Sequence, residues 1–224
     1  MADPVAAVAA LDEPNRRRLY DLVARRTAPI SKDEAAQAAG LPRTTAGFHL
    51  DKLVEMGLLT VVHQRRTGRG GPGAGRPAKL YRRAEEQIAV SLPDRRYEAA
   101  SHLLTDALLE AETTGEPPRE VLRRRAHEWG TALAAAARGD LVQALEDFGF
   151  EPRAGDGSVL LGNCPFHSLA QRHTELVCGL NLRLLTGLAD GIGAGYRARL
   201  DPSPDHCCVR LDQAPSSRSP SVSR

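Results

Sequence analysis

The chain has 224 residues, of which 26% are charged and 42% hydrophobic, the balance of an ordinary globular protein. That length is enough for one or two domains with a buried core, and no apolar run approaches the ~18 residues that a membrane span needs. The first residues do not join a basic segment to an apolar one, so we expect no secretory signal and a cytoplasmic location.

Charge is distributed unevenly along the chain. Residues 1–86 carry 15 Lys and Arg against 10 Asp and Glu, whereas residues 87–224 carry 15 against 18. The stretch between Glu55 and Glu85 contains no acid, and its basic residues are Arg65, Arg66, Arg69, Arg76, Lys79, Arg82 and Arg83. A local positive field of this kind attracts a polyanion such as DNA. The alternative interpretation is a solvated basic loop.

The first 57 residues have the pattern of successive helices. Apolar residues at helical spacing predict a helix over residues 11–26. Ser31 begins a capping-box pattern, and the helix that follows runs to Gly40. Pro42 suits the first turn of another helix, which ends at Gly57. Two short helices joined by a tight turn are typical of a helix-turn-helix.

After Gly57 the pattern becomes strand-like. Two short apolar runs flank the Gly-rich segment TGRGGPGAGRPA, which predicts a β-hairpin wing. This segment is not followed by Gly-Lys-Ser/Thr, so it does not indicate a phosphate-binding P-loop. We therefore expect residues 1–86 to form a winged helix-turn-helix domain.

The second helix of a helix-turn-helix enters the DNA major groove, where its early residues meet base edges. Arg43 can pair with guanine, Lys52 is better placed for phosphate, and wing arginines can enter a minor groove or follow the backbone. The expected DNA-contacting residues are Arg43, Thr44, Thr45, Phe48, His49, Lys52, Arg65, Arg66, Arg69 and Arg76. The alternative is a winged helix that binds another protein.

Residues 87–149 read as helical, with Ala- and Leu-rich stripes over residues 97–112 and 119–138. These stripes are larger than one small domain needs, so we expect this region to form a homodimer interface. The remaining pattern predicts a small α/β sensor domain over residues 150–211 and a disordered tail over residues 212–224. The expected fold class is α+β.

All four cysteines lie in this second half, at Cys164, Cys178, Cys207 and Cys208. They contain no Cys-x2-Cys pair, and buried cysteines are often only packing residues. Cys164, however, stands at a helix start, where a thiolate is stabilised. Cys178 lies within the next helix, and Cys207 and Cys208 begin a strand that can return beside it. Thiolates select iron–sulfur clusters or zinc.

Two sets of residues carry a family resemblance. LPRTTAGFHLDKLVEMGLL and GRPAKLYRR resemble ArsR-type winged-helix repressors. NCPFHSLAQRHTELVCGLN and RLDPSPDHCCVRL resemble the iron–sulfur-sensing repressors of the suf operon, the SufR-like family. The first resemblance is shared by very many regulators, and the second is much more specific.

The second resemblance implies a homodimeric repressor that binds a palindromic operator on double-stranded DNA and holds a [4Fe–4S] cluster through three cysteines. Cys164 and Cys178 match the first two ligands, and the third falls on Cys207 or Cys208. A fourth ligand stays open between His167, a carboxylate and a small molecule.

The predicted function is therefore transcriptional repression under the control of redox or iron–sulfur status. The alternative is a winged-helix regulator with a zinc site or an organic effector in its C-terminal domain and no cluster. The sequence lacks a nucleophile elbow and any evident cofactor fingerprint of an enzyme, so we expect no enzymatic activity.

Overall fold

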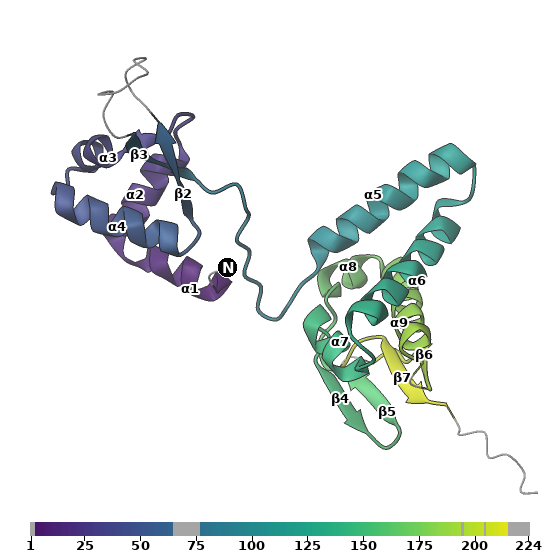
Figure 1. Ribbon diagram of the computed structural model, residues 1–224. Coiled ribbons are helices and arrows are strands. Elements are labelled where there is room, and N and C mark those ends of the chain that lie inside the picture. The colour runs from purple at the N-terminus through teal and green to yellow at the C-terminus, as the bar shows by residue number, and fades with distance from the viewer. Residues whose placement is uncertain (1–2, 65–76, 194, 204, 215–224) are drawn as a thin grey trace, which may run out of the picture. The chain divides into compact units, whose positions relative to one another are not determined.

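The computed structural model describes residues 3–64, 77–193, 195–203 and 205–214 (Figure 1). The chain divides into two compact units, Met1–Val90 and Ser91–Arg224. The mixture of helix and sheet agrees with the expected α+β class.

The N-terminal unit begins with helices whose ends follow the sequence signals. The Ser31 hydroxyl oxygen accepts a hydrogen bond from the Glu34 backbone N–H, and the Glu34 carboxylate accepts one from the Ser31 backbone N–H, so the predicted capping box is confirmed. Gly40 ends the helix in the left-handed region, at φ +62°. The helical elements are α1 (Pro4–Ala9), a 3-10 turn (Ala10–Asp12), α2 (Pro14–Ala24), α3 (Lys32–Ala39) and α4 (Arg43–Glu55).

A small antiparallel sheet completes this unit. It contains β1 (Ile30–Ser31), β2 (Leu59–Gln64) and β3 (Ala78–Arg83), in the order β1-β3-β2. Val61 lies opposite Tyr81 in the register of the β2–β3 hairpin. The predicted hairpin strands are therefore present. The segment that joins them, residues 65–76, lies outside the described residues.

The apolar faces of these elements meet in one core. Its largest fully buried side chains are those of Leu19, Ile30, Leu50, Leu53 and Tyr81. Each such side chain contributes about 1.5–3 kcal/mol to the free energy of folding when it leaves water. This core fixes α4 against α2, α3 and the sheet, and it determines which face of α4 remains exposed.

Among the described residues of the C-terminal unit, five helices form the larger part: α5 (Tyr97–Thr114), α6 (Pro118–Ala136), α7 (Leu141–Phe148), α8 (His167–Arg172) and α9 (Thr174–Ile192). The apolar spacing predicts one long helix over residues 167–190, but the structure has two. The break is at His173, whose φ of −135° and ψ of 52° leave the helical region. No proline or glycine marks this break in the sequence.

The unit also contains an antiparallel sheet in the order β4-β5-β7-β6. Asp156 and Gly157 both have positive φ in the turn between β4 and β5, as an Asp-Gly hairpin turn requires. The strands are β4 (Pro152–Gly155), β5 (Ser158–Leu161), β6 (Tyr196–Leu200) and β7 (Val209–Gln213).

The start of the predicted tail is wrong by at least two residues. Asp212 and Gln213 belong to β7, because Asp212 pairs with Ser158 of β5 and with Arg197 of β6. The Asp212 carboxylate also forms ion pairs with Arg199 and Arg210. Residues 215–224 lie outside the described residues.

Helices and sheet share one hydrophobic core in this unit. Phe148 and Phe150 stack on each other, and Phe148 also meets Phe166 edge-on. Leu184 of α9 and Val209 of β7 belong to the same buried cluster. The predicted boundary between residues 149 and 150 therefore falls inside a single body of packed structure.

Candidate nucleic-acid interface and four-cysteine site

The exposed face of α4 carries most of the residues expected to contact DNA. Arg43, Thr44 and Phe48 are exposed, and Thr45 and Lys52 are half-buried. Phe48 is 66% exposed, which is unusual for a large aromatic side chain. An exposed ring on this helix can pack against a thymine methyl group.

Two of the basic side chains on α4 are held by ion pairs. Arg43 Nε lies 2.5 Å from Asp33 Oδ1 of α3, and both side chains are more than half exposed. Lys52 Nζ lies 2.9 Å from Glu55 Oε1. Exposed ion pairs of this kind contribute about 0–1 kcal/mol, so DNA can replace the carboxylates at little cost.

His49 differs from the prediction. Its side chain is buried at 8% exposure, and its Nδ1 lies 3.4 Å from Glu13 Oε2, at the start of α2. The cause is helical periodicity, which places His49 on the core side of α4 beside buried Leu50 and Leu53, while Phe48 points outward. A base contact by this ring would require α4 to leave its own core.

One contact of α4 was missed by the sequence analysis. Asp51 Oδ1 accepts hydrogen bonds from Lys79 Nζ at 2.6 Å and from Tyr81 Oη at 2.8 Å. Burial would raise the pKa of Asp51, but these two donors outweigh it and lower the pKa. The contact ties α4 to the wing strand β3. Because the partners are 28 and 30 residues apart, no local pattern in the sequence indicates it.

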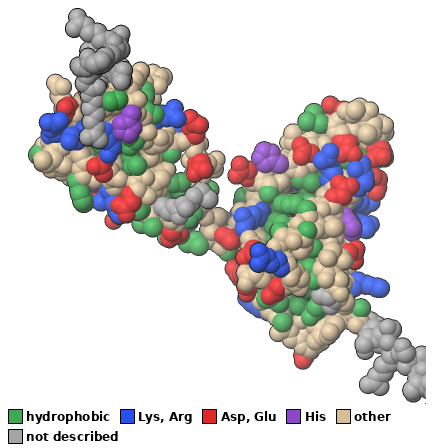
Figure 2. Space-filling model, in the orientation of Figure 1, with side chains coloured by type: hydrophobic (Ala, Val, Ile, Leu, Met, Phe, Trp, Pro, Cys, Tyr) green, Lys and Arg blue, Asp and Glu red, His purple; other side chains and the backbone are tan. Residues whose placement is uncertain are grey.

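The four wing arginines, Arg65, Arg66, Arg69 and Arg76, lie outside the described residues. Within the described part of the wing, Lys79 contacts Asp51, and Arg82 pairs with Glu85 at 3.0 Å. In Figure 2 the N-terminal unit shows Lys and Arg side chains interspersed with Asp and Glu side chains.

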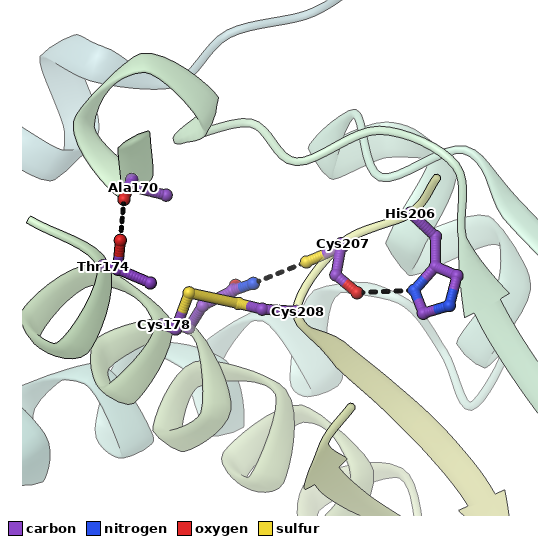
Figure 3. Close-up of a disulfide and its surroundings, with 7 residues drawn as sticks. Ala170, Thr174, Cys178, His206, Cys207 and Cys208 are labelled. Atoms are coloured by element: carbon purple, nitrogen blue, oxygen red, sulfur yellow. Dashed lines mark hydrogen bonds between the residues drawn. A yellow bond between two sulfur atoms is a disulfide. The ribbon is translucent and has the colours of Figure 1, made fainter. Parts of the chain in front are cut away.

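The second site lies in the C-terminal unit, where α9 passes the start of β7 (Figure 3). Cys178 of α9 and Cys208 form a disulfide with a Cα–Cα distance of 6.2 Å. Cys207, next to Cys208, is buried and has a free thiol, as does Cys164. We call Cys164, Cys178, Cys207 and Cys208 the four-cysteine site. The two adjacent cysteines precede β7 rather than beginning it as predicted.

Cys164 and Cys207 form a hydrogen-bonded thiol pair. Donation from Cys207 lowers the pKa of the Cys164 thiol, against the opposing effect of burial, and the Arg95 charge lowers it further. The same hydrogen bond and burial raise the pKa of the Cys207 thiol. Of the two thiols, Cys164 therefore loses its proton at the lower pH.

Asn181 lies one turn after Cys178 on α9 and faces the same site. Its side chain is completely buried, and its Nδ2 donates a hydrogen bond to Cys207 Sγ at 3.1 Å. Its Oδ1 has no hydrogen-bond partner among the residues that the structure describes. A buried amide oxygen left in this state costs about 1–3 kcal/mol. Asn181 is not among the residues predicted from the sequence, although an Asn within an apolar helix face is a visible signal.

The backbone around Cys164 is held by polar contacts. Asn163, also buried, donates from Nδ2 to the carbonyl oxygens of Asp94 and Gly149. Arg95 donates to Asn163 Oδ1 and to the Cys164 carbonyl oxygen. These contacts fix the corner between β5 and α8 and so fix the position of the Cys164 thiol.

His167, the candidate fourth ligand, is not part of this buried site. Its side chain is exposed, and its Nε2 lies 3.1 Å from Gln171 Nε2. His206 has its ring Nδ1 2.8 Å from the backbone oxygen of Cys207 rather than near a thiol. The convergent groups are therefore the four cysteines and Asn181.

The donor set fits a thiophilic metal centre only when the disulfide is reduced. In the described part of the chain, no three His, Cys, Asp or Glu side chains are placed so that they can hold a metal ion. Two of the four sulfurs are joined to each other, so a single free thiol pair remains. Reduction supplies up to four sulfurs in one place, three from buried cysteines and one from half-buried Cys208, and sulfur is the ligand type that iron–sulfur clusters and zinc require.

None of the described helices is both long and apolar enough to cross a membrane.

No curated protein is similar enough to the chain to match it. Residues 11–62 match a family described as a helix-turn-helix domain. The match covers α2, α3 and α4 completely, and it ends within β2. The N-terminal unit is therefore a helix-turn-helix domain of the winged-helix type, which indicates a DNA-binding transcriptional regulator.

Proposed function

We propose that this protein is a cytoplasmic, homodimeric transcriptional repressor that senses redox or iron–sulfur status through its four-cysteine site. The observation that carries the proposal is the convergence of all four cysteines at one buried place in a chain that also has a helix-turn-helix domain. Buried thiols outside the DNA-binding unit suit a sensor better than a DNA contact.

The DNA-binding step belongs to α4. Its exposed face offers Arg43 for a guanine, Thr44 and Thr45 for a phosphate or a methyl group, and Phe48 for a thymine methyl. Lys52 and the wing arginines contribute contacts to the phosphate backbone, which set affinity and salt dependence. The Asp51–Lys79 contact keeps the wing strand aligned with α4.

Homodimer formation is proposed for the C-terminal unit. Leu108 and Leu109 on α5 are 54% and 57% exposed and lie outside the helix face that buries Ala100, Ala107 and Ala111. In Figure 2 hydrophobic side chains also gather on one face of this unit. A second copy that covers α5 would remove these leucines from water and supply the two-fold symmetry that a palindromic operator requires.

In the reduced protein, Cys164, Cys178 and one or both of Cys207 and Cys208 would hold a [4Fe–4S] cluster. Such a group supplies an oxidant-sensitive centre. Asn181 donates its N–H to the Cys207 sulfur, and hydrogen bonds to ligand sulfurs are one of the protein's means of tuning such a centre. Arg95 and Asn163 hold the Cys164 backbone in place.

Anaerobic purification tests the cofactor. Iron and acid-labile sulfide in equal amounts, with a brown colour and absorbance near about 400 nm, support the cluster. Zinc without sulfide supports the alternative of a zinc-containing regulator. A protein that contains neither iron nor zinc supports the alternative of an organic effector.

Selection of duplexes from a random-sequence DNA library tests the repressor half of the proposal. Enrichment of an inverted repeat supports a two-fold dimer on an operator. Failure to enrich any sequence, with or without the cofactor, contradicts DNA binding.

A further inference from the structure

The four-cysteine site contains a bonded pair and a hydrogen-bonded pair side by side. Cys178 and Cys208 are already oxidised to a disulfide, while Cys164 and Cys207 are free thiols in direct hydrogen-bonding contact. The Cys207 backbone N–H donates to the Leu161 carbonyl oxygen at 2.8 Å. Because Leu161 ends β5 and Cys164 follows three residues later, the same strand end positions both free thiols.

The geometry also separates the two adjacent cysteines. Cys207 is 3% exposed and lies in the core with Val209, whereas Cys208 is half-buried and bonded to α9. Figure 3 shows the Cys207 sulfur joined by a hydrogen bond to a side-chain amide nitrogen rather than bonded to Cys208. Each of these cysteines therefore has its own partner, and a bond between Cys207 and Cys208 is disfavoured.

We propose that, in the cofactor-free chain, Cys164 and Cys207 are the site of a second disulfide, formed by a hydroperoxide, so that the four-cysteine site is a two-disulfide redox unit. The proposal does not depend on the cofactor proposed above, since it concerns the metal-free protein. It does require that the two free thiols respond to oxidant as a pair.

The reaction balances with a hydroperoxide as the oxidant. The Cys164 sulfur attacks the terminal peroxide oxygen, the O–O bond breaks, and the alcohol, or water from hydrogen peroxide, leaves with the thiol proton. Cys164 is then a sulfenic acid. The Cys207 sulfur attacks it, an S–S bond forms, and the hydroxyl leaves as water with the Cys207 proton. Two electrons pass from the sulfurs to the peroxide.

Cys164 is the first to react because it is the more accessible thiol, at 9% exposure against 3% for Cys207. Cys207 is the resolving residue because its backbone is bonded to Leu161, three residues before Cys164, and both thiols belong to the same buried cluster. Asn181 also holds the Cys207 sulfur in place, by a hydrogen bond from its Nδ2.

The test uses the full chain, reduced and freed of metal by a chelator under anaerobic conditions. Hydrogen peroxide is then added, remaining thiols are alkylated after denaturation, and digestion without reductant is followed by mass spectrometry. We expect the free thiols to fall from four to none, with peptides linked as Cys164–Cys207 and Cys178–Cys208. Two residual thiols at Cys164 and Cys207, or mixed pairings, would overturn the proposal.

Matched variants separate attack from resolution. In Cys207→Ser, a dimedone adduct on Cys164 is expected, because the sulfenic acid has lost its resolving thiol. In Cys208→Ser, the Cys164–Cys207 linkage is expected to form as before. Loss of that linkage in a folded Cys208→Ser protein would show that the two pairs are not independent, and circular dichroism verifies the fold. If a variant does not fold, the linkage map of the unaltered chain still decides the proposal.

Discussion

Gly130 of α6 lies directly against the carbonyl oxygen of Leu184 in α9. A Cβ added to Gly130 would fall 1.9 Å from that oxygen, far inside van der Waals contact. The relationship is reciprocal one turn away, because a Cβ on Gly187 of α9 would fall 2.0 Å from the carbonyl oxygen of His127 in α6. The two helix backbones therefore touch without intervening side chains.

The first prediction concerns this contact. Gly130→Ala and Gly187→Ala should each lower the free energy of unfolding by about 1–3 kcal/mol, because the two helices must separate to make room for the added methyl group. Gly179 is a matched control on α9, since a Cβ there meets nothing within 4 Å. Gly179→Ala should be neutral or stabilising by up to about 1 kcal/mol. Denaturant unfolding followed by Trp129 fluorescence measures all three, and equal effects would contradict the close approach.

The second prediction concerns base recognition. Arg43→Ala should cost about 1–3 kcal/mol of binding to the selected operator and relax the preference at one base position. Lys52→Ala should instead weaken binding to all sequences and reduce the salt slope by roughly 0.9 for one lost phosphate contact. Fluorescence anisotropy with a panel of single-base operator variants separates the two results. Identical behaviour of the two variants would remove the distinction between base and phosphate contacts.

The third prediction compares neighbours on α4. Phe48→Ala should weaken operator binding but leave stability almost unchanged, because the ring is 66% exposed. His49→Ala should reduce stability, because its buried ring packs between Phe48 and Glu13. Thermal unfolding and DNA titration of both proteins measure the contrast. A His49→Ala protein of normal stability that has lost base specificity would restore His49 as a DNA contact.

The fourth prediction concerns the Asp51–Lys79 contact. The pKa of Asp51 in the folded protein is lowered, so the contact stabilises the fold at neutral pH. That stabilisation is complete above the ordinary Asp pKa of 3.8 and is lost as the pH falls through the lower folded pKa. Asp51→Asn should therefore increase hydrogen exchange in peptides of β3 at pH 7, and the difference should shrink toward pH 3.

The same pair is more than a third exposed, so the effect on stability should stay below about 1 kcal/mol. Glu55→Gln, which removes the exposed pair with Lys52 on the same helix, is the control. It should leave hydrogen exchange in β3 unchanged, because the Lys52–Glu55 pair lies within α4 and does not join α4 to β3.

The fifth prediction concerns cofactor retention. Cys164→Ser and Cys178→Ser should each abolish it and leave the winged helix folded and able to bind DNA weakly. Cys207→Ser and Cys208→Ser should differ, one severe and one mild, because these adjacent residues differ in burial and in partner. Iron, sulfide and zinc content after anaerobic purification measures the effect. If all four variants keep their full metal content, the cysteines do not hold the cofactor and serve only in packing.

Local signals in the sequence predicted much of this fold. The capping box at Ser31 and the helix end at Gly40 each depend on a few neighbouring residues, and the structure has both. His49 was predicted to contact DNA from its early position in α4, whereas helical periodicity turns its ring toward the core in the structure.

Contacts between distant residues could not be predicted in the same way. The Asp51–Lys79 contact, the partner of each cysteine and the approach of Gly130 to Leu184 depend on how separate elements pack. The sequence placed all four cysteines in one half of the chain, but spacing alone does not determine that Cys178 meets Cys208. The pairing follows from the passage of α9 beside the start of β7.

The bare contact between α6 and α9 also has a mechanical consequence. Side chains between helices can change rotamer and so absorb a displacement, whereas two touching backbones have no such compliance. A shift or rotation of α9 must therefore carry α6 with it. Cys178 and Asn181 lie on α9, where they contact the sulfurs of Cys208 and Cys207. A change of bonding at either sulfur therefore acts on α6 and α9 together, as one rigid pair of helices.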